Sequence, residues 1–351
     1  MDKAERRIDL REKAAKKVTI KDIARMSGYS VGTVSRVLNE SPNVSEDARR
    51  KVEAVVKATD FRLNSNAKHL RQQTNTGIAV IVKGAMNMLF ASLVEQLQGL
   101  IRERGYACLI YYIDEDDNEV ELAIQVCRER HPQGILFLGS TLDDFRRQFS
   151  AVTVPCVLVT NSAAALGFAN LSSVSTDDAA GAEKAIEHFL ALGHRKIGIL
   201  AGKTGISNAA NTRYQGCLRA FAAHGLPFDP ERQMVMARFG LASGYDAMTE
   251  LLDKMPDLTA VFAMSDVMAV GAIRAIRDRG LLVPGDISVI GYDGIDLGRY
   301  LDPQLTTIRQ HREVIARRSV EILLRCMREH TPAIHEITPF DLIPGGSVRR
   351  L

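Results

Sequence analysis

From residue 77 onward, short apolar runs alternate with stretches of helical periodicity. Each apolar run is too short for a helix, and roughly 10 to 20 residues with helical spacing separate most of the runs, which is typical of βαβ units. We therefore predict an α/β body whose parallel strands form two doubly wound subdomains. The predicted strands lie at residues 77–82, 108–113, 134–139, 156–161, 196–201, 260–265 and 286–293.

The last part of the chain is predicted to cross back between the two subdomains. LTTIRQ at 305–310 and a helical stretch at 312–328 belong to this part, and a final strand is expected near 336–343. Each subdomain then takes chain from two regions. We expect the N-subdomain at about 77–172 and 310–337, and the C-subdomain at about 173–309 and 338–351.

The N-terminal pattern differs, because apolar residues there recur at helical spacing over short distances. A first helix follows Thr19 and ends at Gly28. Ser30 can cap a second helix and Ser45 a third. Three α-helices within about 42 residues predict a helix-turn-helix headpiece, which we expect at 18–63.

The second of these helices has one apolar stripe, formed by Val34, Val37 and Leu38. Its other positions face outward. In a helix-turn-helix unit the second helix enters the DNA major groove, where exposed side chains contact base edges while hydroxyls and backbone amides bind phosphates. The pattern therefore favours DNA as the partner of this helix.

Composition adds a division of charge. The 351 residues correspond to two or three domains, and 46% hydrophobic and 25% charged residues exclude wholesale disorder. Residues 1–75 carry 17 lysines and arginines against 10 acids, a net charge of +7, whereas the remainder carries 28 against 32, a net charge of −4. A basic head on an acidic body indicates a polyanionic partner for the head.

The N-terminus contains no secretory signal, because residues 1–17 are charged throughout and lack an apolar core. No apolar run approaches the length of a membrane span. We therefore expect a cytoplasmic, nucleoid-associated protein with no membrane partner, preceded by a charged arm at 1–17. The cysteines are odd in number and far apart, which favours reduced thiols over disulfides; they are Cys108, Cys127, Cys156, Cys217 and Cys326.

The stretch VTIKDIARMSGYSVGTVSRVLNESPNVSEDARRKVEAVVKATDFRLNSNAKHL resembles the DNA-binding headpiece of the lactose/galactose repressor (LacI/GalR) family, and TVSRVLN is its most specific part. The resemblance implies that Val31 and Gly32 discriminate operators and that Arg36 recognises guanine. An arginine can bond guanine O6 and N7, and a valine can contact a thymine methyl group, whereas Gly32 offers no side chain. The expected major-groove residues are Tyr29, Ser30, Val31, Gly32, Thr33, Ser35, Arg36 and Asn39.

Residues 64–76 are predicted to form a linker with a short helix at about 65–72. So short a helix is unstable alone in water, and the resemblance implies a hinge helix that folds when two copies pair in the minor groove and wedge it open. Leu63 stands where the family usually has proline, so ordering of the hinge is expected to be less favourable. The expected minor-groove residues are Asn64, Ala67, Lys68 and Leu70.

In open α/β sheets, ligands bind beyond the carboxyl ends of the parallel strands, and this rule selects residues without family knowledge. Phe90 follows the first predicted strand of the body, and Thr160, Ser265, Asp266 and Asp293 end later strands. We expect these residues to face one another across a cleft between the two subdomains.

Residues 77–348 also resemble the periplasmic-binding-protein-like effector domain of the same family, through ALGHRKIGILAG, NTRYQGCLRAF, MSDVMAVGAIRAIRDRGLLVPGDISVIGYDG and LTTIRQ. The resemblance implies that Arg213 bonds ligand hydroxyls or a carboxylate, that Asp293 accepts from hydroxyls and that Phe239 forms an aromatic wall. Such a set suits a sugar. The expected effector-binding residues are Phe90, Thr160, Arg213, Phe239, Ser265, Asp266 and Asp293.

The sequence departs from the family pattern at this cleft. Family members often have an acid where Thr160 stands and asparagine where Ser265 stands, and Gly294 replaces a second aspartate. These departures predict a less acidic pocket than usual. Because the chain has no tryptophan, the stacking wall must come from Phe90, Phe239 or Tyr112.

No GxSxG, GxGxxG, Walker A or HExxH pattern occurs, so the sequence supports neither an enzyme nor a cofactor. His194 lies at a predicted helix-to-strand turn and is expected to be structural. His330 and His335 have no partner at metal-ligand spacing, so we expect no metal site.

Together these features predict a transcriptional repressor that binds double-stranded, pseudo-palindromic operator DNA as a homodimer. The last residues carry no apolar heptad pattern, which favours a dimer over a tetramer. A sugar-like effector would shift the population of two subdomain arrangements and so control the hinge. The alternatives are a global regulator of the same family that responds to a phosphoprotein or a purine corepressor and, more remotely, a cytoplasmic solute-binding protein or an enzyme.

Overall fold

The computed structural model describes residues 20–38, 44–59, 77–84, 87–204 and 208–351. The chain forms two compact units, Met1–Thr74 and Asn75–Leu351. The first contains the headpiece and the second is the body. None of the helices in the described part of the chain combines the length and the apolarity that a bilayer crossing requires.

The headpiece contains the three predicted helices, α1 (Ile20–Ser27), α2 (Val31–Leu38) and α3 (Glu46–Ala58). Gly28 ends α1 with a φ of 75°, a conformation that a side chain would disfavour. Ser30 and Ser45 accept hydrogen bonds from backbone amides at the starts of α2 and α3, as predicted. The small core between the three helices contains Ile23, Ala24, Val34, Val37 and Val52.

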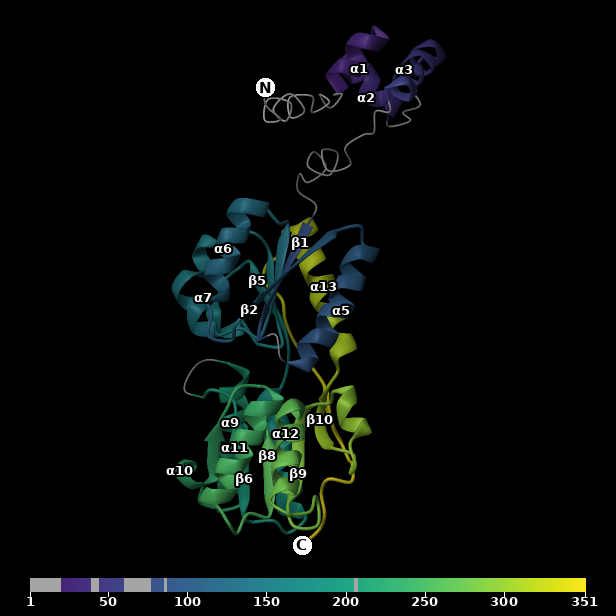
Figure 1. The fold of residues 1–351 in the computed structure, drawn as a ribbon. Helices are drawn as coiled ribbons and strands as arrows, with labels where there is room; N and C mark the ends of the chain where they lie inside the picture. The colour runs from purple at the N-terminus through teal and green to yellow at the C-terminus, as the bar shows by residue number, and fades with distance from the viewer. Residues whose placement is uncertain (1–19, 39–43, 60–76, 85–86, 205–207) are drawn as a thin grey trace, which may run out of the picture. The chain divides into compact units, whose positions relative to one another are not determined.

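The N-subdomain of the body has a six-stranded sheet with helices on both faces. Its elements are β1 (Gly77–Lys83), α5 (Met88–Glu103), β2 (Ala107–Ile113), α6 (Glu119–Arg130), β3 (Gly134–Leu138), α7 (Leu142–Gln148), β4 (Cys156–Val159), β5 (Leu171–Thr176), α13 (Arg312–Glu329) and β11 (His335–Thr338). The strand order is β11-β5-β4-β3-β1-β2, and all neighbours are parallel. α5 and α13 cover one face, while α6 and α7 cover the other (Figure 1).

The C-subdomain repeats this plan. Its elements are α8 (Asp178–Ala191), β6 (Ile197–Ala201), α9 (Ala209–Ala223), α10 (Pro230–Gln233), β7 (Met234–Met236), α11 (Leu241–Lys254), β8 (Ala260–Ala263), α12 (Asp266–Asp278), β9 (Ser288–Asp293), β10 (Thr306–Gln310) and β12 (Phe340–Ile343). The strand order is β12-β10-β9-β8-β6-β7, and only β12 pairs antiparallel with its neighbour. α8 and α9 pack on one face, and α11 and α12 on the other. Among the described residues of the body, short 3-10 helices also occur at Phe149–Ala151, Ala164–Leu166 and Asp296–Tyr300.

The two doubly wound subdomains confirm the predicted fold class, and every predicted apolar run contains a strand. The pattern did not predict β5, whose sequence LSSVST is rich in hydroxyls although the whole strand is buried. These hydroxyls have partners: Ser173 Oγ bonds His335 Nδ1 at 2.8 Å, and Thr176 donates to Gln310 at 3.0 Å. A polar sequence forms a buried strand when its hydroxyls are hydrogen-bonded in this way. The three-residue β7 was also missed.

The prediction of one final strand at 336–343 is wrong, because that segment divides at Pro339 into β11 in the first sheet and β12 in the second. β5 also lies wholly in the first sheet, so the chain leaves the N-subdomain after Thr176 rather than after 172. It returns after Gln310 and crosses a third time at Pro339. Three crossing segments therefore join the two halves of the body.

Candidate functional site

The outward face of α2 is the candidate DNA-binding surface of the headpiece. Val34 and Val37 are buried in the core, so the opposite side of the helix faces solvent. Val31 is 40% exposed, and Gly32 and Arg36 are exposed as well. No hydrogen bond or ion pair joins Arg36 to another residue in the described part of the chain. Its guanidinium is therefore open to a partner from outside.

Residues at the start of α2 are fixed by contacts within the headpiece. Ser30 Oγ accepts from the Thr33 amide at 3.1 Å and lies 2.9 Å from Thr33 Oγ1. The Tyr29 hydroxyl donates to Asp47 on α3 at 2.9 Å, which ties the turn before α2 to the third helix. Ser35 is half-buried on α2. Outside the described residues lie Asn39 and the four predicted hinge residues Asn64, Ala67, Lys68 and Leu70.

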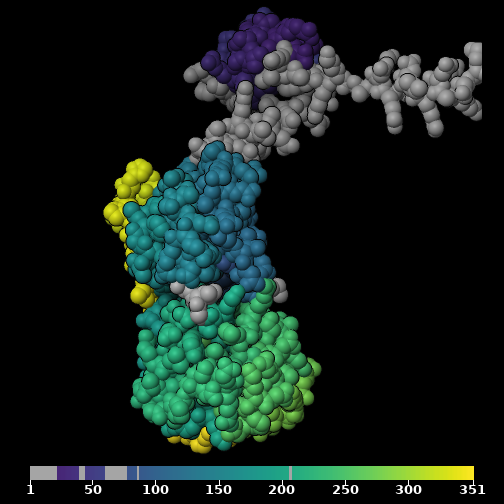
Figure 2. Space-filling view, turned by 90° about the vertical axis from the view of Figure 1, so that its left-hand side faces the viewer, coloured from purple at the N-terminus to yellow at the C-terminus, as the bar shows by residue number. Residues whose placement is uncertain are grey.

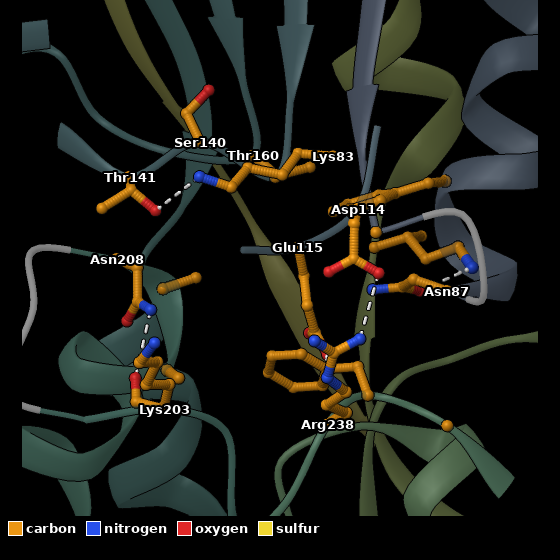
Figure 3. Close-up of a pocket in the computed structure, with 18 of the residues that line it drawn as sticks. Lys83, Asn87, Asp114, Glu115, Ser140, Thr141, Thr160, Lys203, Asn208 and Arg238 are labelled. Atoms are coloured by element: carbon orange, nitrogen blue, oxygen red, sulfur yellow. Dashed lines mark hydrogen bonds and ion pairs between the residues drawn. The ribbon is translucent and has the colours of Figure 1, made fainter. Parts of the chain in front are cut away.

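A cavity of about 960 Å³ lies between the two subdomains of the body, at the carboxyl ends of strands from both sheets. Small-molecule sites have volumes of roughly 300 to 1,000 Å³. Figure 2 shows where the two subdomains meet, and Figure 3 shows side chains that both contribute to the cavity. The predicted effector-binding residues that line it are Phe90, Thr160, Arg213, Phe239 and Asp293.

Arg213 on α9 lines the cavity from the C-subdomain and is only 5% exposed. Its Nε donates to Asp178 Oδ1 at 2.7 Å, and its Nη2 lies 3.6 Å from Asp293 Oδ1. The guanidinium also lies 3.7 Å from the centroid of the Tyr292 ring, a cation–π contact. Gln310 donates to Asp293 at 2.8 Å. This network fixes the Asp293 carboxylate at the cavity.

Burial controls the charges of this network. It raises the pKa of Asp293 to about 7, although Arg213 and Gln310 act in the opposite direction. Burial also raises the pKa of Asp178. Burial alone would lower the pKa of Arg213, but the two carboxylates outweigh it and the pKa is raised overall. Arg213 therefore stays charged, whereas Asp293 titrates near neutral pH.

The raised pKa of Asp293 makes the stability of the body depend on pH. The contribution is fully present below the ordinary pKa of 3.8 and is lost as the pH rises through about 7, because ionisation is easier in the unfolded chain. Asp293→Asn cannot ionise. We therefore expect its melting temperature to rise relative to that of the wild type between pH 5 and pH 8, measured by calorimetry. If the difference in melting temperature between Asp293→Asn and the wild type stays constant across this pH range, the raised pKa of Asp293 is contradicted.

Two aromatic rings approach the backbone closely at the cavity. A Cβ on Gly202 would lie 2.6 Å from Phe239 Cζ, and a Cβ on Gly139 would lie 2.7 Å from Phe90 Cε2. Glycine at both positions leaves the space that the rings occupy. Phe90 and Phe239 belong to different subdomains, so the cavity has an apolar wall on each side.

The N-subdomain wall combines a buried ion pair with an unpartnered hydroxyl. Lys83 Nζ, at the end of β1, lies 2.7 Å from Glu119. Thr160 has a φ of 79°, a strained conformation for a β-branched residue, and the next residue, Asn161, donates to the Ser140 carbonyl oxygen. Ser140 is one of the lining residues, but its Oγ is buried, points away from Lys83 and Thr141 in Figure 3 and has no hydrogen-bond partner within the described residues.

Ion pairs join the two subdomains across the cavity, as Figure 3 shows. Arg238, which follows β7, bonds Asp114 at 3.0 Å and Glu115 at 2.9 Å, and it also pairs with Asp116. Lys203, which follows β6, lies 3.4 Å from Asp116. The acids come from the N-subdomain and the cations from the C-subdomain, so these contacts favour the observed arrangement of the two.

The cavity contains acids that the comparison with the family pattern did not consider. The departures from the family pattern at Thr160, Ser265 and Gly294 are real, but another loop supplies acids. Four acids follow β2 directly in the sequence, and the strand-end rule applied to that strand would have found them. The carboxylates that line the cavity are Asp114, Glu115, Asp116, Asp117 and Asp293.

Two predicted effector-binding residues do not line the cavity. Ser265 Oγ accepts from the Met268 amide at 3.3 Å and caps α12. The Asp266 carboxylate accepts from the Ile295 amide at 2.8 Å and from the Thr307 hydroxyl at 2.6 Å. Both side chains are fully buried, and the C-subdomain itself occupies their hydrogen-bonding groups. Their position at a strand end serves the fold rather than the cavity wall.

Comparison with known proteins finds a matching family model in the headpiece and another in the body. The family described as "Bacterial regulatory proteins, lacI family" matches residues 19–64, and the periplasmic binding protein-like domain matches residues 186–348. The transcriptional regulator MalR of Clostridium butyricum is 33% identical over 335 residues, covering 94% of this chain and 99% of MalR. GalR of Escherichia coli (strain K12) is 32% identical over 306 residues, covering 87% of this chain and 88% of GalR.

Solved structures agree as well. The lac repressor dimer bound to operator and the anti-inducer ONPF superimposes with a TM-score of 0.74 and 25% identity, over 95% of this chain and 100% of that chain. The complex of the regulator CelR with cellobiose gives a TM-score of 0.69 and 27% identity, over 94% and 99% of the two chains. A helix-turn-helix headpiece joined to a periplasmic-binding-protein-like body defines a class of bacterial transcriptional regulators. The chain belongs to the LacI family within that class.

Proposed function

We propose that this LacI-family regulator is a repressor that binds a pseudo-palindromic operator as a homodimer, under the control of a small sugar-like effector. The observation that carries the proposal is the cavity between the subdomains, where Arg213 and Asp293 supply fixed polar groups from the C-subdomain. A few fixed polar groups beside the rings of Phe90 and Phe239 suit a polyhydroxylated ring.

The relatives support a sugar-like ligand. One solved relative is a complex of CelR with cellobiose, and a LacI-family regulator from Enterococcus faecium holds bound ribose. The second of these is 26% identical to this chain, covers 78% of it and superimposes with a TM-score of 0.68. A ligand of the same general chemistry is therefore our proposal for this cavity.

The proposed mechanism is a population shift between two arrangements of the subdomains. An effector in the cavity contacts walls from both halves of the body, so its binding energy differs when their separation changes. Three crossing segments allow the halves to move against one another as hinged bodies. The movement would act on the linker at 64–76, and through Asn64, Ala67, Lys68 and Leu70 on the fit to the minor groove.

In the headpiece, we propose that α2 enters the major groove. Arg36 would bond guanine and Val31 would contact a thymine methyl group, while Gly32 leaves its base pair without a side-chain contact. Tyr29, Ser30, Thr33, Ser35 and Asn39 would bind phosphates or adjacent base edges.

The test begins with selection of DNA ligands from a random library by the full-length protein. We expect a pseudo-palindromic consensus and binding of the selected duplex with an affinity at least 1,000-fold above that for a scrambled duplex. Fluorescence anisotropy then follows operator binding against sugars, sugar phosphates and purines. We expect at least one compound to change the operator Kd about 10-fold or more. Selection without any consensus, or an operator Kd that no compound changes, would contradict the proposal.

A further inference from the structure

The chain from the headpiece enters the body at the end of the N-subdomain opposite the cavity. β1 begins there at Gly77, which accepts from the Gln133 amide at 2.9 Å and pairs with Ala107 at the start of β2. Met327, near the end of α13, is close as well, because its Sδ would lie 3.2 Å from a Cβ on Gly134. The ends of α5, α6 and α13 therefore lie beside the start of β1, at the upper end of the N-subdomain in Figure 1.

Arginines gather at this end. The segments that contain the three helix ends, 102–107, 128–134 and 325–334, carry six arginines and three glutamates, and we call them together the basic end. All six arginines are exposed, and Arg325 pairs with Glu329 at 3.0 Å. Within the described residues, the other five make no side-chain hydrogen bond or ion pair; they are Arg102, Arg104, Arg128, Arg130 and Arg328.

The rest of the body has the opposite charge. Outside the basic end, residues 76–351 carry 22 lysines and arginines against 29 acids. Helix dipoles attract cations to carboxyl ends, but cations at such positions in the C-subdomain have carboxylate partners. Lys254 pairs with Glu250 at 2.8 Å, and Arg279 pairs with Asp253 at 2.8 Å. Helix dipoles alone therefore do not explain five arginines without partners.

A DNA duplex is the polyanion that the basic end can meet. The headpiece itself is an unfavourable occupant, because residues 1–75 carry a net charge of +7 and would be repelled. The 17 residues between Thr59 and Gly77 span at most about 60 Å, so the linker keeps DNA that the headpiece binds within reach of the body. Arginines spread over three helix ends suit an extended row of phosphates, because a duplex carries a negative charge every ~1.7 Å along its axis.

We propose that the basic end of the N-subdomain is a second DNA-binding surface, which contacts phosphates of the duplex that the headpiece holds. The inference rests on DNA binding by the headpiece and is independent of the effector. Guanidinium groups without an internal partner can bond phosphate oxygens without first breaking an ion pair. The release of counterions from those phosphates adds affinity whatever the base sequence. Repulsion of the acidic remainder of the body favours the orientation in which the basic end faces the duplex.

The test compares two triple variants of the full-length protein that lose the same number of charges. One removes a cation from each helix end of the basic end, by Arg104→Gln, Arg130→Gln and Arg328→Gln. The control removes three exposed cations outside the basic end that have no partner within the described residues, by Lys184→Gln, Arg299→Gln and Arg350→Gln. Fluorescence anisotropy measures the binding of a random-sequence duplex of about 40 base pairs from roughly 50 to 200 mM KCl, because the salt dependence reports phosphate contacts.

We expect the basic-end variant to bind the duplex about 5-fold or more weakly than wild type, and the slope of log K against log salt to fall by about 1 or more. The control should leave both quantities close to those of the wild type. Lysine at the same three positions of the basic end should restore both, because an ammonium group keeps the attraction for phosphate. The melting temperature of each variant shows that the body is folded.

An unchanged Kd and salt slope in the glutamine variant of the basic end would overturn the inference. Equal losses in the control would overturn it too, because they would reflect the total charge rather than this surface. A loss that lysine does not restore would point to a structural role of the arginines and reject phosphate contact. A wild type that binds no duplex at any salt concentration would overturn the proposed function together with this inference, so the two failures are distinguishable.

Discussion

Replacing Arg213 with methionine is expected to lower the free energy of unfolding of the body by about 3–5 kcal/mol, because it leaves buried carboxylates without a cation. Arg213 lies 2.7 Å from Asp178 and 3.6 Å from Asp293, and all three side chains are almost inaccessible. Part of the loss is recovered if Asp293 takes up a proton, which its raised pKa favours. Urea denaturation of the full chain, followed by circular dichroism, measures the change.

The same helix supplies the control. Arg219 on α9 pairs with Glu183, but its side chain is 53% exposed, so Arg219→Met should change the stability by no more than about 1 kcal/mol. Adding Asp178→Asn to Arg213→Met removes one of the unpaired charges and is expected to restore part of the lost stability. Equal effects of the two arginine substitutions would contradict a buried network, as would a double variant less stable than Arg213→Met alone.

The apolar pattern predicted the body well because parallel strands covered on both faces are apolar along their whole length. The apolar pattern failed where a buried strand contains polar residues and where the chain passes from one sheet to the other. β5 is buried through hydroxyls that find partners on β11 and β10, and those partners lie more than a hundred residues away in the sequence. Pro339 divides a continuous-looking strand between two sheets, which periodicity alone does not reveal.

The site was predicted where a residue's position on its own strand decides its role. Thr160 directly follows β4 and Asp293 ends β9, and both line the cavity, as the strand-end rule requires; Phe90 lines it from the first turn of α5, the helix after β1. Ser265 and Asp266 satisfy the same rule but turn inward. Their partners come from helix α12 and from the segments around residues 295 and 307, a tertiary arrangement that the local sequence does not specify.

The ion pairs across the cavity were missed for a related reason. Arg238 and the acids that it contacts are separated by more than a hundred residues, and each looks like an ordinary solvated charge in its own loop. Only the packing of two subdomains against one another brings them together. The same packing places the acids at 114–117 on the wall of the cavity.

Arg36→Ala is expected to reduce discrimination between operators at one base pair by about 1–3 kcal/mol, a factor of roughly 5 to 150 in relative affinity. Arg36 is exposed on α2, and nothing in the described part of the headpiece holds its guanidinium. Its side chain can therefore bond guanine without first breaking an ion pair, so the effect should appear as altered base preference. Selection of DNA ligands with the variant, followed by anisotropy on single-substituted duplexes, measures it.

Arg25 on α1 is the matched control, because it is also exposed but already paired with Asp22 at 3.2 Å. Arg25→Ala should leave the selected consensus unchanged and lower the affinity for all duplexes by a similar, small factor, as expected when only phosphate attraction is lost. An Arg36→Ala variant that selects the wild-type consensus would contradict base recognition. So would equal losses of affinity on operator and random DNA, because a residue that contacts only phosphates weakens binding without regard to sequence.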